Sequence, residues 1–252
     1  MKKMFKEYFI LLLLIHIIGD FYFQTNRIAK KKVTSIGWVI VHCLCYLAAA
    51  IAILVSLYSL KMLWSAIAVA GIHAVIDIVK FYYLKRNNKA RNLKKERTVF
   101  FLDQIVHIAA LIGAAYIFTV DIGEMKMNVS IEHFFDIIDI PVWTVICWYS
   151  ALLLIHKPAN LVVTKLLSIY KPDDKDKEKN DKNAGRLIGT LERIIMLIFI
   201  SINQYAAIGL VLTAKSIARY DKISRERDFA EYYLLGTLTS TLIVLVISLI
   251  VR

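Results

Sequence analysis

Three histidines inside apolar stretches of the chain each have an aspartate four positions away. The pairs are His16 with Asp20, His73 with Asp77, and His107 with Asp103, and another apolar stretch carries His42 alone. Residues four apart on a helix lie on one face, one turn from each other, so each pair can converge on one point. A charged side chain inside a bilayer costs about 2.5 to 3.5 kcal/mol, so such a placement requires a partner or a function.

These side chains offer four imidazoles and three carboxylates. Nitrogen with oxygen suits zinc, manganese or iron, whereas magnesium takes few nitrogens and copper(I) prefers sulfur. The site could hold one divalent ion. Because seven groups exceed the ligands of one tetrahedral ion, it could also hold two ions about 3.5 to 4 Å apart, bridged by an aspartate. Zinc is the first choice, and manganese or iron are alternatives. The predicted metal ligands are His16, Asp20, His42, His73, Asp77, Asp103 and His107.

Two further polar side chains share this spacing. Gln24 lies four positions after Asp20 and Lys80 three after Asp77, so both can reach the edge of the site. Lys80 would suit a phosphate or an oxyanion, or else extend from a helix end like many membrane lysines. Gln24 and Gln104 would position substrate or orient the ligands. The catalytic candidates are Asp20, Asp103 and Lys80, with one aspartate as base.

The segments that must position these residues are long and apolar. Hydrophobic residues make up 58% of the 252 positions, and only nine glycines and three prolines interrupt them. The apolar stretches lie near residues 7–23, 36–58, 62–84, 99–120, 140–156, 194–213 and 230–251. A membrane helix needs about 20 such residues, and lipid cannot satisfy an open sheet edge. The sequence therefore predicts an all-α, polytopic membrane protein with about six to seven membrane helices.

The distribution of charge predicts the orientation of these helices. Basic clusters at residues 27–32 and 85–97 are typical of cytoplasmic loops, whereas the acidic stretch 121–139 should face outward. If every segment crossed, the basic N-terminus and the 215–227 loop would both fall outside. We therefore expect the first and sixth segments to be re-entrant or half-inserted, the sixth breaking at its Asn-Gln pair, residues 203–204.

A charged stretch divides the chain. The sequence KPDDKDKEKNDKNAG, residues 171–185, has almost no apolar side chain and cannot bury a core. We expect a disordered cytoplasmic linker there. It would separate an N-terminal membrane bundle carrying the His/Asp site, residues 1–170, from a C-terminal membrane helical pair, residues 186–252.

The site motifs resemble a family. The succession HIIGDFYFQ (16–24), a lone His42, HAVIDIVK (73–80) and DQIVH (103–107) resembles the bacterial integral-membrane family catalogued as domain of unknown function 3307. The resemblance continues through GRLIGTLER, NQYAAIGLVLTAKS and FAEYYLLGTL in the second half. It implies a protein of the bacterial cytoplasmic membrane but no settled activity. By analogy, the His/Asp pairs are also similar to an inner-membrane family of metal-dependent hydrolases.

These observations favour a membrane-embedded metal-dependent hydrolase that acts through metal-activated water. A rise of 1.5 Å per residue places the site roughly 6 to 17 Å below the cytoplasmic surface, where a lipid-phase substrate can reach it. The nearby lysines favour a phospholipid or an isoprenoid phosphate over a peptide. The membrane lipid or lipid-linked substrate is thus the expected partner.

Three other hypotheses remain open. As the alternative to a hydrolase, the same cluster would serve a metal-ion or proton-coupled transporter. It would otherwise hold a structural metal in a membrane scaffold or defence effector, or pair helices without any metal. Nucleotide-driven and serine-dependent chemistry are disfavoured because no P-loop, dinucleotide-binding glycine pattern or G-x-S-x-G occurs. The net charge of +12 does not predict nucleic-acid binding, because the basic residues cluster at segment ends. His133 and His156 are expected to be ordinary exposed or interfacial histidines.

Overall fold

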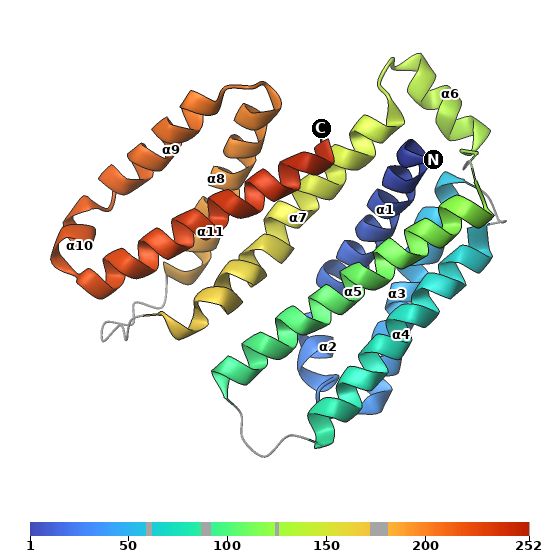
Figure 1. Ribbon diagram of the computed structural model, residues 1–252, viewed down its shortest axis with the longest axis horizontal. Coiled ribbons are helices and arrows are strands. Elements are labelled where there is room, and N and C mark those ends of the chain that lie inside the picture. The colour runs from blue at the N-terminus through green and yellow to red at the C-terminus, as the bar shows by residue number, and fades with distance from the viewer. Residues whose placement is uncertain (59–61, 87–91, 124–125, 172–180, 252) are drawn as a thin grey trace. The chain divides into compact units, whose positions relative to one another are not determined.

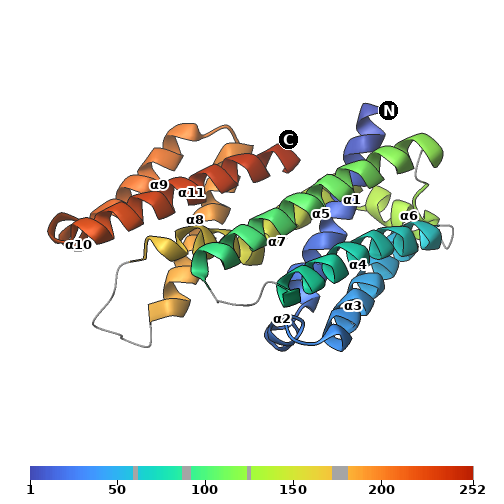
Figure 2. The same ribbon diagram turned by 60° about the horizontal axis from the view of Figure 1, so that its bottom comes forward.

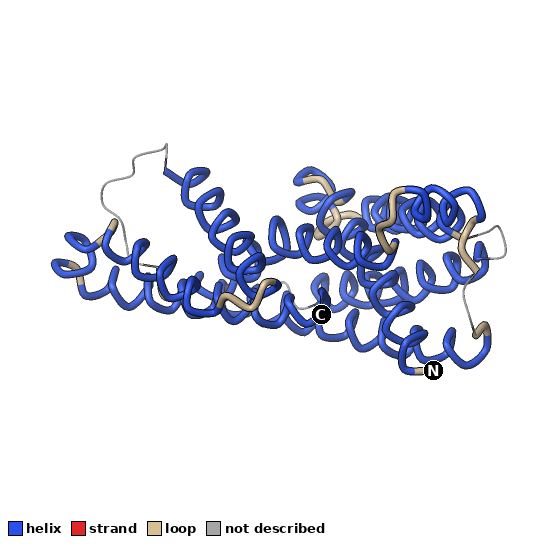
Figure 3. The backbone as a smooth tube through the Cα atoms, turned by 90° about the horizontal axis from the view of Figure 1, so that it is seen from above, coloured by secondary structure: helices blue, strands red, loops and turns tan. Residues whose placement is uncertain are grey.

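The computed structural model describes residues 1–58, 62–86, 92–123, 126–171 and 181–251. All regular secondary structure within these ranges is helical, as the tube in Figure 3 shows. The predicted all-α fold is therefore confirmed.

Among the described residues, five helices are long and apolar enough to cross a membrane. They are α3 (Ile36–Leu57), α4 (Leu63–Arg86), α5 (Leu93–Asp121), α7 with the 3-10 turn that follows it (Val142–Ile169), and α11 (Arg227–Val251). Their outward faces carry large apolar side chains, such as Val75, Val79 and Ile105, that are 61 to 63% exposed. Such faces suit lipid and not water. The chain is a polytopic helical membrane protein.

The chain forms two compact units, Met1–Ser150 and Ala151–Arg252. In the first unit α3 packs on α4 and α4 on α5, and the three helices lie side by side (Figures 1 and 2). The short helix α2 (Asn26–Lys31) packs on α3, and α6 (Val129–Ile137) follows α5.

Helix α1 (Lys2–Ile17) is the centre of the first unit. It packs against both α5 and α3. Its residues 10–15 are all at most 7% exposed, so this part of the helix is buried around its whole circumference. A helix that is apolar on every side is normally buried in this way. With 16 residues, α1 is shorter than the five candidate membrane spans.

The outer helices of this unit bury one stripe each. On α3 the buried stripe includes His42 and Tyr46, on α4 it includes His73 and Asp77, and on α5 it ends in a row of small residues after His107. Three- and four-residue spacing produces such a stripe on an α-helix. The polar residues that the sequence singled out therefore face the interior.

The second unit contains the rest of α7 (Val142–Leu166), η3 (Leu167–Ile169), α8 (Asp181–Ser201), α9 (Tyr205–Ile217), α10 (Tyr220–Arg225) and α11. Helix α8 packs on α11 and on α9. The sixth apolar segment breaks where we expected. Helix α8 ends at Ser201, and Asn203 takes a left-handed backbone conformation, with φ at 59°, before α9 begins.

The division of the chain differs from the expected one in two respects. The units meet inside α7, after Ser150, and not at the charged stretch. Residues 172–180 of the expected linker lie outside the described residues, but α8 begins at Asp181, so residues 181–185 are helical. Hydrogen bonds explain the earlier boundary, because Asn160 on α7 is bonded to Thr190 and Arg193 on α8.

A buried arginine joins three helices of the second unit. Arg193 is 2% exposed and donates hydrogen bonds to Asn160 Oδ1 at 2.7 Å and to Ser240 Oγ at 3.1 Å. These bonds connect α8 to α7 and to α11. Its described hydrogen-bond acceptors are uncharged, including Thr190 Oγ1 at 3.4 Å. Arg193 is therefore a structural clamp.

Replacing this arginine should loosen the second unit. Arg193→Ala leaves the buried hydroxyl of Ser240 and the partly buried Oδ1 of Asn160 without their donor, and an unpaired buried polar group typically costs about 1 to 3 kcal/mol. We expect a lower apparent unfolding temperature in detergent, measured by differential scanning fluorimetry. Arg186→Ala, an exposed arginine on the same helix, is the control and should change little. Equal stability of the two variants would contradict the stabilising role of Arg193.

Candidate functional site

All seven side chains predicted as metal ligands lie in the interior of the first unit. Each is at most 8% exposed, and they come from α1 and the turn after it, α3, α4 and α5: His16, Asp20, His42, His73, Asp77, Asp103 and His107. Potential ligand atoms of these residues lie within 4.8 Å of one another in three overlapping groups. The groups share His73 and Asp77, so the seven residues form one continuous cluster.

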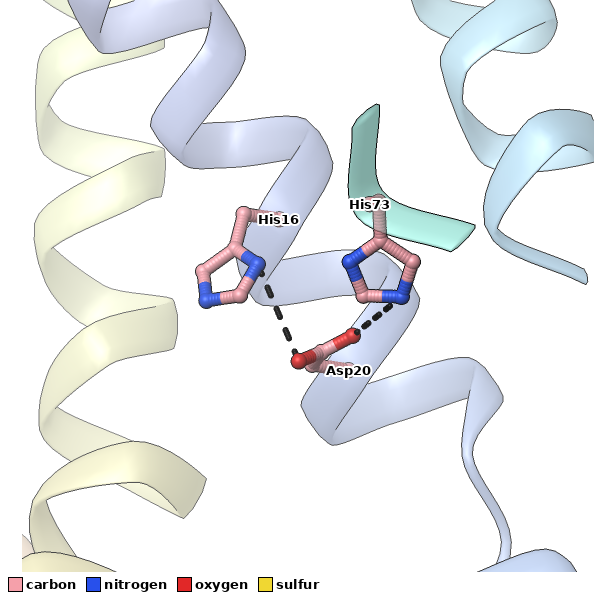
Figure 4. A group of neighbouring side chains, drawn as sticks. All are labelled: His16, Asp20 and His73. Carbon is pink, nitrogen blue, oxygen red and sulfur yellow. Dashed lines mark ion pairs between the residues drawn. The ribbon is translucent and has the colours of Figure 1, made fainter. Parts of the chain in front are cut away.

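Asp20 lies between histidines of different helices. Figure 4 shows its carboxylate between the rings of His16 and His73. Asp20 Oδ2 is 3.7 Å from His16 Nδ1, and Oδ1 is 3.4 Å from His73 Nε2. Oδ1 is also 3.3 Å from His42 Nε2. One carboxylate thus faces three imidazoles.

A π-helical turn, η1 (Ile18–Phe23), brings Asp20 to this position. The Gln24 N–H donates to the Gly19 carbonyl at 3.2 Å, five residues back, which widens the turn that follows α1. Gly19 packs against the ring of Tyr46, where a Cβ atom would lie only 2.5 Å from Cδ2. π-Turns of this kind are rare and frequently lie at functional sites.

The separations of two histidine nitrogens at the centre of the cluster, from each other and from two carboxylate oxygens, are close to those in a metal coordination shell. His42 Nε2 is 3.2 Å from His73 Nε2 and 3.3 Å from both Asp20 Oδ1 and Asp77 Oδ2. His73 Nε2 is 3.4 Å from Asp20 Oδ1 and 3.9 Å from Asp77 Oδ2. Ligands about 2.1 Å from a zinc ion lie about 3.4 Å apart in a tetrahedron. These four residues fit a divalent cation by chemistry and by spacing.

The pair of Asp103 and His107 extends the cluster onto α5. His107 Nδ1 lies 2.9 Å from the Asp103 carbonyl oxygen and donates to it. In a neutral ring this hydrogen bond places the proton on Nδ1 and the lone pair on Nε2, and Nε2 is buried with no hydrogen-bond partner among the described residues. A metal-binding histidine commonly has this arrangement, in which a carbonyl fixes the tautomer. Its ring also lies against those of His16 and His73, with centroids 5.1 and 4.7 Å apart.

Other ring nitrogens in the cluster also lack partners. Both nitrogens of His16 and the Nδ1 atoms of His42 and His73 are buried without hydrogen bonds among the described side chains, and so is Asp103 Oδ1. A buried polar atom without a partner costs about 1 to 3 kcal/mol. So many in one place favour an additional ligand, such as a cation, water or substrate.

Two lysines border the cluster. Lys32 Nζ lies 3.0 Å from Asp77 Oδ2, and Lys80 Nζ lies 2.6 Å from Asp103 Oδ2. Their side chains are 14% and 24% exposed, more than any of the seven clustered residues. With neutral imidazoles, the three aspartates and two lysines leave one negative charge in excess. A divalent cation is therefore electrostatically compatible with the cluster.

The remaining predicted residues differ in position. Lys80 contacts the cluster as expected, and Gln104 Nε2 donates to Asp103 Oδ2 at 3.3 Å. Gln24 Oε1 is buried without a described partner, and no direct contact joins it to the seven residues among the described interactions. His133 and His156 are both exposed, as expected.

Sequence reasoning missed two residues of the site. The Tyr46 ring stacks on His73 with centroids 3.8 Å apart and planes 10° apart, and it also supports Gly19. Its position four residues after His42 was the signal that placed it on the same face. Lys32 was counted only with the basic loop, because nothing in the sequence connects it to Asp77, 45 residues away.

Apolar helices around a buried His/Asp cluster define an integral membrane protein with a polar centre. The chain belongs to the family described as "Protein of unknown function (DUF3307)", which it matches over residues 8–136. The match covers about half of the chain and includes all seven clustered residues. No curated protein and no solved structure matches the chain, so the analogy with metal-dependent hydrolases has no support from relatives.

A methyl group at the π-turn should disturb the cluster. In Gly19→Ala the new Cβ would displace Tyr46, which in turn supports His73. We expect a destabilised protein, because overpacking typically costs about 1 to 3 kcal/mol. Thermal unfolding in detergent measures the effect. In the control, Gly71→Ala on α4, the Cβ meets nothing within 4 Å, and a helical alanine should stabilise by about 0.5 to 1 kcal/mol. Two variants of equal stability would refute the proposed contact.

Proposed function

We propose that this protein is a membrane-embedded metal-dependent hydrolase. The observation that carries the proposal is the central group of two imidazoles and two carboxylates, from Asp20, His42, His73 and Asp77, with separations of 3.2 to 3.9 Å. Zinc is the first choice for this donor set, and manganese or iron are alternatives. The pair Asp103 and His107 offers a second position, with Asp77 between the two.

A bound divalent cation would lower the pKa of its water toward about 7 and polarise a phosphoryl or carbonyl oxygen. Asp103 is the best-placed base. Lys80 and Gln104 hold its Oδ2, whereas Oδ1 is buried and makes no hydrogen bond to a described residue. Oδ1 can therefore accept a proton from a water molecule in the cluster. Lys80 stabilises the ionised form of that carboxyl group or the substrate's anionic group.

The substrate is expected to reach the cluster from the lipid phase. His42, His73, Asp77, Asp103 and His107 lie on helices long enough to cross a bilayer, at a level near the ends of α2 and α4 that carry basic residues. Basic loops are typical of the cytoplasmic side. We therefore infer a site near the inner leaflet of the bacterial cytoplasmic membrane and a phospholipid or isoprenoid phosphate as substrate, in preference to a peptide.

Metal analysis of the purified protein tests the first part of the proposal. Elemental mass spectrometry should find one or two divalent ions per chain in the wild type. His73→Ala and Asp77→Ala should each lose most of this metal, because each removes a donor shared by two of the three ligand groups. His133→Ala, an exposed histidine outside the cluster, should retain it. Absence of metal from the wild type, or equal content in all variants, would end the proposal.

The role of Asp103 gives a separate prediction. Asp103→Asn keeps the size of the side chain but cannot accept a proton from water. We expect metal content to remain within about twofold, while metal-dependent hydrolysis of a lipid phosphate falls by about 10² to 10⁴. Phosphate release from detergent-solubilised substrate measures the rate. A variant with full activity would show that another group is the base.

One observation favours a second candidate function. The rings of His16, His107, His73 and His42 form a continuous series, with successive centroids 5.1, 4.7 and 5.2 Å apart. Buried imidazoles and carboxylates in series are typical of proton relays in transporters. A proton-coupled or metal-ion transporter would move protons or metal across proteoliposomes without changing any substrate covalently, which distinguishes it from the hydrolase.

A further inference from the structure

Lys32 is paired with a carboxylate oxygen that the proposed metal ion would need. Its Nζ atom lies 3.0 Å from Asp77 Oδ2. The same oxygen lies 3.3 Å from His42 Nε2 and 3.9 Å from His73 Nε2, within the central group of imidazoles and carboxylates. Lys80 differs, because it pairs with Oδ2 of Asp103, which does not belong to that central group.

Two cations on this oxygen would repel each other strongly. A zinc ion would lie about 2.1 Å from Asp77 Oδ2. With the ammonium group of Lys32 3.0 Å from the same atom, the two positive centres would be no more than about 5 Å apart. The residues around them are almost completely buried, and solvent and salt screen buried charges poorly. Binding of the metal therefore favours the departure of the ammonium group.

The charge balance of the cluster leads to the same result. With neutral imidazoles, three aspartates and two lysines leave the metal-free cluster one negative charge in excess. A divalent ion added with both lysines in place would reverse this and leave one positive charge in excess. If Lys32 leaves as the ion enters, the cluster is neutral. Uncompensated buried charge is costly, so the exchange of Lys32 for one divalent ion is favoured.

The position of Lys32 lets its side chain move while the backbone stays in place. Lys32 directly follows α2, and its side chain is 14% exposed, whereas that of Asp77 is 3% exposed. Arg27 and Lys31 of α2 lie over the ring of Trp38, 5.6 and 4.7 Å from its centroid, and so fasten α2 to α3. The stem of a lysine is flexible and its ammonium group is strongly hydrated, so this group can turn to solvent at the basic loop.

We propose that Lys32 is the counter-ion of the metal-free centre and that an incoming divalent metal ion displaces it from Asp77. Lys32 thus sets the affinity for metal by competition, and its release couples metal binding to a change at the loop end of the site. Lys80 stays on Asp103 in both states. The inference rests on the metal centre of the proposed function and not on its hydrolytic step.

Zinc titration of metal-stripped protein in detergent, against a chromophoric chelator, tests the competition. Lys32→Met should bind zinc at least about tenfold more tightly than the wild type, because the competing cation is gone. Lys32→Arg keeps a cation at this position and should show no such gain. Lys31→Met, an exposed neighbour, controls for the change in net charge and should also show no such gain.

Amine labelling of the wild type gives a second measure that needs no variant. Acetylation by a water-soluble reagent, followed by mass spectrometry, should be slow at Lys32 without metal. At saturating zinc it should be at least about fivefold faster, because the ion pair no longer holds the amine in its charged, unreactive form. Lys80 should keep its low rate, and the exposed Lys30 should react quickly in both states. If Lys32→Met does not fold, this measurement decides alone.

The outcomes separate the inference from the proposed function. Equal zinc affinity of the wild type and Lys32→Met, or unchanged labelling of Lys32 at saturating zinc, would overturn the displacement and leave the metal centre in place. A gain in Lys31→Met as large as that in Lys32→Met would reduce the effect to net charge and overturn the displacement as well. If neither the wild type nor the variants bind zinc, the displacement and the metal-dependent function both fail.

Discussion

Three carboxylates are buried inside a bundle of apolar helices, and this constraint governs the rest of the first unit. Asp20, Asp77 and Asp103 are at most 8% exposed. Carboxylates in such surroundings must have donors or cations close by, because their hydration is lost. The structure supplies a lysine to two of them, Asp77 and Asp103, and at least one imidazole to each of the three. The lysines lie at the edge of the cluster and the histidines in its middle. The cluster therefore has a direction, from its cationic edge to its imidazole centre.

That direction connects local helix geometry to the proposed chemistry. On α4 the four-residue spacing puts His73 and Asp77 on the same buried stripe, and the next turn carries Lys80 to the rim. The antiparallel α5 presents Asp103 and His107 in the matching order. Two helices thus supply a cationic end, a donor layer and an apolar end without any irregular backbone between them.

The irregular part of the site is confined to the segment after α1. The π-turn lets Asp20 reach α3 and α4 while α1 remains packed in the centre of the unit. Tyr46 fills the space against Gly19 and holds the ring of His73 from the other side. The packing core and the polar cluster therefore share one aromatic side chain. Disturbing either one should disturb the other.

The sequence by itself determined the helical membrane class, the identity of the seven clustered residues and the break at residues 203–204. These follow from apolar length, from four-residue spacing and from local backbone preference, which act within one helix. Only the tertiary structure decided the π-turn, the roles of Tyr46 and Lys32, and the boundary inside α7. Each of these depends on contacts between helices distant in sequence, such as Lys32 with Asp77 or Asn160 with Arg193. Helical periodicity fixes which face a residue occupies but not which neighbouring helix it meets.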